Sequence, residues 1–173
     1  MTSEEIKAIV YYIQGLQVLW KESYNAEKVG DYTFNFICRD VRDYNTTNEL
    51  WEVINELQFM GEGEEWEKTK EEVEALIQEK LGIRICEPIS ILSYTTNLFI
   101  KQLTNDFSTN SLVLSFIEQT KELITYQEYT LALENLLKSL LEKCIFIPRD
   151  TLAIIDVIDD SYIKRLQASL WGV

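Results

Sequence analysis

The chain has 173 residues, of which 46% are hydrophobic and 26% are charged, and it contains no histidine. This composition is typical of a globular protein and argues against disorder, and the length suits one domain that buries its own core. The formal net charge of −13 argues against free nucleic acid as a ligand, because binding phosphates requires a cationic surface.

Apolar residues that recur at spacings of three and four predict a series of helices in the first half of the chain. Thr2 and Glu5 form a capping-box pattern, and Gly15 inside the first helix indicates a close neighbour or a bend. The predicted helices run from about Thr2 to Asn25, from Asp31 after a break at Gly30 to Tyr44, from the cap Thr46 to Phe59, and from Glu64 to Leu81 before a C-cap at Gly82. Their apolar stripes comprise Ile6, Ile9, Val10, Ile13, Leu16, Trp20, Phe34, Ile37, Cys38, Val41, Leu50, Trp51, Ile54, Leu57, Trp66, Val73, Leu76, Ile77 and Leu81.

The second half begins with a short apolar link from Ile83 to Cys86, which could also form a brief strand. Pro88 fits the first turn of the next helix, and the polar loop at 105–110 offers caps for the one after it. The apolar stripes that follow comprise Ile89, Leu92, Thr96, Phe99, Ile100 and Leu103, then Leu112, Val113, Phe116, Ile117, Thr120, Leu123 and Ile124, then Leu152, Ile155 and Ile158, and finally Tyr162, Ile163, Leu166 and Leu170 before Trp171.

The run from Tyr126 to Cys144 predicts the central packing helix of the fold. Ala132 is the one small residue in its apolar stripe, so another helix could approach closely there. After the run, Ile145 to Pro148 form a short extended link, and a new helical pattern begins near Asp150. The stripe that should be buried comprises Tyr129, Ala132, Leu133, Leu136, Leu137, Leu140 and Leu141.

These stripes predict an all-α fold, a single domain over residues 1–173 formed by a bundle of about seven to nine helices with short loops. No Asn-Gly hairpin signal occurs. The paired pattern of the helices after residue 88 leaves a solenoid-like stack as an alternative, although no fixed period is present. The charge divides the chain unevenly, with net −10 over residues 1–87 and net −3 over residues 88–173.

The chain contains no CxxC pair, P-loop or GxGxxG motif, and we expect no cofactor. Cys38, Cys86 and Cys144 are far apart and lie in or beside apolar runs, so we expect buried thiols in a reducing cytoplasm. The acidic start at Met1 has no basic region, so we expect no signal peptide, and no apolar run is long enough to span a membrane. We expect a soluble, cytoplasmic protein that is not an enzyme.

The central helix carries a resemblance to a known family. A Glu-Tyr pair, an Ala-Leu-Glu-x-Leu run, a later acidic residue and an apolar link ending at Pro resemble bacterial immunity proteins of the Maf type, and the immunity proteins of contact-dependent inhibition more broadly. The resemblance covers about a quarter of the chain, in its second half, and Thr130 stands where relatives often have glycine. The matching residues are Glu128, Tyr129, Ala132, Leu133, Glu134, Leu136, Glu142 and Ile145 to Pro148.

The resemblance implies a protein that binds and neutralises a cognate toxin domain, often a nuclease. The acidity of the chain agrees, because an acidic surface can mask a cationic nucleic-acid-binding cleft. The most acidic segment is residues 49–79, with net −9. In it Trp66 belongs to an apolar stripe, which favours a core position, but it is also flanked by carboxylates in the manner of an interface residue. The predicted partner-binding residues are Glu62, Glu64, Glu65, Trp66, Glu67, Glu71 and Glu72.

Two other functions remain open from the sequence. Asp156, Asp159 and Asp160 suggest a small metal-dependent enzyme if Asp156 and Asp160 share a helix face, with Asp106 as a partner. A helical adaptor or oligomerisation module would need no catalytic residues at all. The oligomeric state is not specified by any pattern in the chain.

Overall fold

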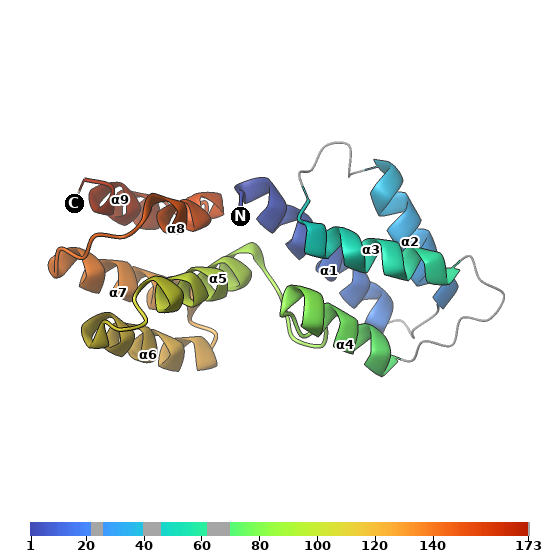
Figure 1. Ribbon diagram of the computed structural model, residues 1–173, viewed down its shortest axis with the longest axis horizontal. Helices are drawn as coiled ribbons and strands as arrows, with labels where there is room; N and C mark the ends of the chain where they lie inside the picture. The colour runs from blue at the N-terminus through green and yellow to red at the C-terminus, as the bar shows by residue number, and fades with distance from the viewer. Residues whose placement is uncertain (22–25, 40–45, 62–69, 173) are drawn as a thin grey trace. The chain divides into compact units, whose positions relative to one another are not determined.

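The computed structural model describes residues 1–21, 26–39, 46–61 and 70–172, and over them the chain is helical with no strand (Figure 1). The predicted all-α fold and the predicted number of helices are therefore confirmed for this part of the chain. The helices are α1 (Ser3–Lys21), α2 (Ala26–Arg39), α3 (Asn48–Gly61), α4 (Lys70–Leu81), α5 (Ile91–Asp106), α6 (Ser111–Thr125), α7 (Tyr129–Glu142), α8 (Arg149–Ala153), the 3₁₀ turn η1 (Ile154–Val157) and α9 (Ser161–Leu170).

Contacts within the chain gather into two compact units, the first over residues 3–89 and the second over residues 90–173. The boundary lies beside the point at which the sequence changes from strongly to weakly acidic. Whether the two units fold together as the predicted single domain stays a prediction.

In the first unit, α2 packs against α1 and α3, and α3 packs against α4. The predicted stripes supply the core, since each of the four apolar positions Ile6, Ile13, Ile54 and Ile77 is fully buried. Tyr12 is also fully buried, and its ring lies 5.1 Å from that of Phe36 between centroids. Its hydroxyl shares a hydrogen bond of 3.3 Å with Thr33, which satisfies the polar end of a buried aromatic side chain.

The close neighbour that Gly15 predicts is Tyr32 of α2. A Cβ atom at Gly15 would overlap the ring and the hydroxyl group of Tyr32. The same hydroxyl donates to the backbone carbonyls of Tyr11 and Tyr12 at 3.4 Å. The glycine therefore allows the tyrosine to lie directly against the backbone of α1.

Three local predictions for the first unit are wrong. Gly30 and Asp31 do not break the chain, because α2 continues through both and Gly30 is buried inside it, where packing outweighs its low helix propensity. Phe34 is 52% exposed, since the buried face of α2 runs through Val29, Thr33 and Phe36 instead. The cap of α3 is Thr47 and not Thr46, because its hydroxyl accepts from the amide of Leu50 at 3.2 Å.

In the second unit, α7 packs against α5, α6 and α9, as the central-helix prediction requires (Figure 1). Its apolar stripe is buried at all but its two end positions, Tyr129 and Leu141, which are half-buried. α5 also packs against α8 and η1. The buried members of the stripe are Ala132, Leu133, Leu136, Leu137 and Leu140.

Side chains define where the helices of the second unit begin. Ser90 and Ser93 form a complete capping box at the start of α5, so Pro88 lies before this helix and not in its first turn as predicted. Asn110 caps α6, and Asp160 caps α9 through the amides of Tyr162 and Ile163. Each cap satisfies backbone amides that no helical carbonyl can reach.

Candidate partner-binding surface

The predicted partner-binding residues divide between described and undescribed parts of the chain. Glu62, Glu64, Glu65, Trp66 and Glu67 lie outside the residues that the structure describes. Glu71 and Glu72 lie in the first turn of α4, and both are exposed. Their position suits the helix N-terminus, where the backbone dipole favours negative charge.

Further carboxylates extend this acidic surface onto α3. Glu49, Glu52 and Glu56 are spaced by three and four residues, so they share one side of α3, and all three are exposed. Lys80 of α4 reaches Glu52, with its Nζ atom 2.9 Å from a carboxylate oxygen. We define Glu49, Glu52 and Glu56 as the α3 acidic face.

The field of this surface acts on Lys80 itself. The pKa of Lys80 is raised, first by its hydrogen bond to Glu52 and by the charge of Glu52, and then by the charges of Glu79 and Glu56. One ammonium group therefore lies among several carboxylates of α3 and α4, and the surface remains negative.

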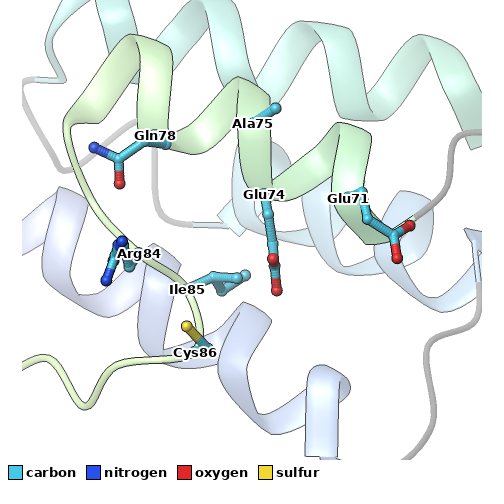
Figure 2. Close-up of a pocket in the computed structure, with 7 residues that line it drawn as sticks. All are labelled: Glu71, Glu74, Ala75, Gln78, Arg84, Ile85 and Cys86. Carbon is cyan, nitrogen blue, oxygen red and sulfur yellow. The ribbon is translucent and has the colours of Figure 1, made fainter.

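A hollow of about 400 Å³ lies beside α4, between this helix and the turn that follows it. Figure 2 shows that its side chains come from one side of α4 and from the segment 84–86. Glu74 accepts a hydrogen bond of 3.1 Å from the indole nitrogen of Trp20 in α1. The residues that line the hollow are Glu71, Glu74, Ala75, Gln78, Arg84, Ile85 and Cys86 (Figure 2).

The segment after α4 is held against α1 by two glutamines. The side-chain amide of Gln17 donates to the carbonyls of Ile85 and Glu87 at 3.0 and 2.7 Å, and that of Gln14 donates to the carbonyl of Ile89 at 3.0 Å. A second, more apolar hollow of about 440 Å³ lies along this contact. Its lining comprises Gln14, Gln17, Val18, Trp20, Lys21, Ile85, Cys86, Pro88 and Ile89.

The prediction of buried thiols is wrong for two of the three cysteines. Cys86 and Cys144 are both exposed and free. Cys86 follows Ile85, which is buried, and lies on the outer side of a turn closed by a hydrogen bond from the Glu87 amide to the Arg84 carbonyl at 3.1 Å. The side chain of Cys38 lies outside the described residues.

The aspartates proposed for a metal-dependent enzyme do not share a helix face. Asp156 lies in η1, where it accepts from Gln167 at 2.5 Å, whereas Asp160 has extended backbone and caps α9. Asp159 binds Lys164 at 2.9 Å, and Asp106 accepts from Thr151 at 2.6 Å. In the part of the chain that the structure describes, no three Cys, Asp or Glu side chains are grouped as a metal site.

On the surface of the second unit, cationic side chains lie over aromatic rings. Lys138 and Arg165 both lie over the ring of Tyr162, at 5.0 and 5.3 Å from its centroid. Trp171 is 41% exposed, and Arg149 lies 5.7 Å from its ring. Lys138, Arg149 and Arg165 thus lie against neighbouring aromatic rings.

Sequence analysis missed both hollows because they depend on where the segment 83–89 lies. In this segment Ile83 and Ile85 are buried while Arg84 and Cys86 are exposed, and of the two exposed residues only the charged Arg84 is marked as outward-facing by the sequence. The contacts of Gln14 and Gln17 with this segment span about 70 residues of sequence. No local pattern indicates such a contact.

No protein-family model, curated protein or solved structure matches this chain. Among the described residues, no helix has the length and apolar composition needed to cross a membrane.

Proposed function

We propose that this chain is an immunity protein that acts by binding and not by catalysis. It would occupy the cytoplasm of the producing bacterium and bind a cognate protein toxin, a basic nuclease domain, whose active or substrate-binding cleft it covers. The observation that carries this proposal is the acidic surface of α3 and α4, where Glu49, Glu52 and Glu56 lie on one side of a helix.

The charges of this surface exceed what the local fold requires. Acidic residues near the start of α4 stabilise the helix dipole, but Glu52 and Glu56 lie beyond the first turn of α3 and gain nothing from it. Lys80 pairs with Glu52 and Glu79, yet it supplies a single positive charge. A surface with an excess of acidic residues favours a cationic partner and speeds its association, because opposite charges steer diffusion.

The resemblance in α7 supports the same function through other residues. Ala132, Leu133 and Leu136, which match the family pattern, are buried packing residues of the second unit. Glu134 of the same pattern is half-buried, and its carboxylate lies 3.7 Å from the Nζ atom of Lys138. The matching residues thus support a similar helical framework, while the acidic surface supports the mode of binding.

The test uses the protein encoded immediately upstream of this chain. We expect that protein to lose its toxic activity when this chain is added at equal molar concentration, and to form a complex whose affinity falls as salt rises. Co-expression should restore growth to cells that express the upstream protein alone. A toxin that stays active in the presence of excess immunity chain would contradict the proposal.

A further inference from the structure

The hollow along α1 is largely apolar, and its charge is opposite to that of the unit around it. Among the described residues that line it, Lys21 is the one charged side chain and no carboxylate occurs, although residues 1–87 have net charge −10. Its volume of about 440 Å³ lies in the range of pockets that hold small organic groups. The apolar part of the lining comprises Val18, Trp20, Ile85, Pro88 and Ile89.

Hydrogen bonds hold the walls of this hollow in place. Gln14 and Gln17 of α1 donate to backbone carbonyls of the segment 85–89, which forms the opposite wall. Trp20 donates its indole N–H to Glu74 at 3.1 Å, so its polar atom is satisfied and its ring adds apolar surface. Binding here therefore requires little ordering of the walls, which lowers its entropic cost.

Lys21 supplies the polar contact of the hollow. It is the last residue of α1 and is exposed, and among the described residues its ammonium has no ion pair or side-chain hydrogen bond. A cation at this end of a helix favours the helix dipole, which accounts for the lysine without any ligand. The dipole does not account for the apolar walls beside it. Together they match an apolar group that is joined to a carboxylate.

The open side of the hollow favours a protein over a small molecule as the occupant. Val18 lines the hollow and is 56% exposed. Small molecules bind in clefts that bury most of their surface, whereas an open hollow leaves one side of its occupant in water. A protein that inserts a side chain covers this open side with its own surface.

We propose that this hollow receives an aromatic side chain of the protein partner that is flanked by a carboxylate, with the ring against Val18 and Trp20 and the carboxylate at Lys21. Aromatic residues are enriched at interfaces, and a ring gains further from packing against the indole of Trp20. This inference rests on the proposed function only for the identity of the partner. It adds the contact that holds the toxin after the acidic surface of α3 and α4 has attracted it.

The first experiment titrates the ¹⁵N-labelled full chain with N-acetyl-phenylalanine at about 0.15 M salt, where charges more than about 8 Å away are screened. We expect saturable shifts of backbone amides at residues 14–21 and 85–89. N-acetyl-phenylalanine amide, which lacks the charge, should bind roughly two- to fivefold more weakly. N-acetyl-alanine, which lacks the ring, should bind at least about tenfold more weakly. Equal shifts with all three probes would overturn the proposal.

Variants of the full chain separate the two contacts. Lys21→Met keeps an apolar stem and should abolish the preference for the acid over the amide. Lys101→Met is the matched control, because Lys101 is exposed on α5 in the second unit, and it should keep that preference. Val18→Thr keeps the shape of the wall but adds a hydroxyl group, so it should weaken the acid and the amide alike, by about twofold. A preference that survives Lys21→Met, or that Lys101→Met also abolishes, would contradict the carboxylate contact.

The upstream protein tests the same hollow as an interface. Val18→Thr/Lys21→Met should speed dissociation of its complex by roughly three- to tenfold and change the association rate less than about twofold, because an anchoring contact acts mainly on dissociation. Unchanged dissociation together with full inhibition would refute docking at this hollow and leave the immunity function intact. Binding of the probes as expected, without any inhibition of the upstream protein, would refute the immunity function alone.

Discussion

The two units of the chain bury similar cores but carry different surfaces. Residues 1–87 have net charge −10 and residues 88–173 have net charge −3. In the first unit, Lys80 lies among carboxylates of two helices, and a hollow with acidic residues adjoins α4. In the second unit, Lys138 and Lys164 pair with nearby acids, and Lys138, Arg149 and Arg165 lie over aromatic rings.

This difference shows that the acidity is not a requirement of the helical fold. The second unit forms five α-helices among its described residues around the buried stripe of α7, with almost balanced charge. The excess of carboxylates in the first unit therefore calls for another explanation. The proposed binding of a cationic partner would account for it, and the predictions that follow test the two units in turn.

The largest expected effect is on the core of the second unit. Leu136→Ala should lower the free energy of unfolding by about 2–5 kcal/mol, because Leu136 is 1% exposed at the centre of α7 and its removal leaves a cavity. Leu131→Ala in the same helix is the control, since Leu131 is 44% exposed, and it should cost less than about 0.5 kcal/mol. Urea denaturation followed by circular dichroism measures both.

The same variant tests whether the chain is one domain. If the predicted single domain is correct, Leu136→Ala should lower hydrogen-exchange protection in α1 and α3 as well as in α7, because cooperative unfolding exposes all of them together. Loss of protection confined to residues 90–172 would show instead that the two units unfold independently.

The second prediction concerns the acidic surface. Glu71→Lys/Glu72→Lys should slow association with the toxin by about tenfold at low salt and flatten its salt dependence, because these changes reverse two charges on the steering surface. Glu118→Lys/Glu122→Lys on α6 of the second unit changes the net charge equally and should have a smaller effect. Stopped-flow association rates at several salt concentrations compare the two. Equal association rates for both variants would show that the rate depends on the net charge of the chain and not on where the charge lies.

The third prediction concerns the contact of α1 with α2. Gly15→Ala should destabilise the chain by about 1 kcal/mol, since overlap with Tyr32 outweighs the higher helix propensity of alanine. In a Tyr32→Ala background the overlap is absent, so the same change should stabilise by roughly 1 kcal/mol. A double-mutant cycle from denaturant melts measures the reversal of sign. A destabilising Gly15→Ala in both backgrounds would contradict this account of the glycine.

Much of the fold was predictable because helical periodicity reports burial directly. The stripe of α7 and the stripe through Ile6, Ile9 and Ile13 are buried as predicted. Helix boundaries were less predictable where several residues could serve as caps. Helix α5 begins directly after Ser90 and not at Pro88, because the hydroxyl groups of Ser90 and Ser93 each accept a hydrogen bond from the backbone amide of the other residue.

The candidate site was only partly predictable, for a different physical reason. Acidity is a property of composition, so the exposed positions of Glu71 and Glu72 followed from the sequence. The hollow depends on where the segment after α4 lies, and hydrogen bonds from Gln17 in α1 fix that position. Cys86 was misassigned because an apolar neighbourhood in sequence does not determine which side of a turn a residue occupies.

The smallest expected effects are on the free energy of unfolding as pH changes. They come from one ion pair in each unit, one at high pH and the other at low pH. The pKa of Lys80 is raised by Glu52, so the pair stabilises the fold below the ordinary lysine pKa and this contribution is lost as pH rises through the raised value. The pKa of Asp159 is lowered by Lys164, so that pair stabilises the fold above the ordinary aspartate pKa and is lost as pH falls through the lowered value. Both pairs are solvent-exposed, so each effect is small and screened by salt.

Glu52→Gln should return the pKa of Lys80 toward its ordinary value and leave Asp159 unchanged, while Lys164→Met should raise the pKa of Asp159 and leave Lys80 unchanged. Each variant is the control for the other because the pairs belong to different units. Side-chain NMR titrations of Lys80 and Asp159 measure both shifts. If Lys80 kept its full shift in Glu52→Gln, the charges of Glu56 and Glu79 would be its main cause, and the acidic surface of α3 and α4 would act as one field with no dominant pair.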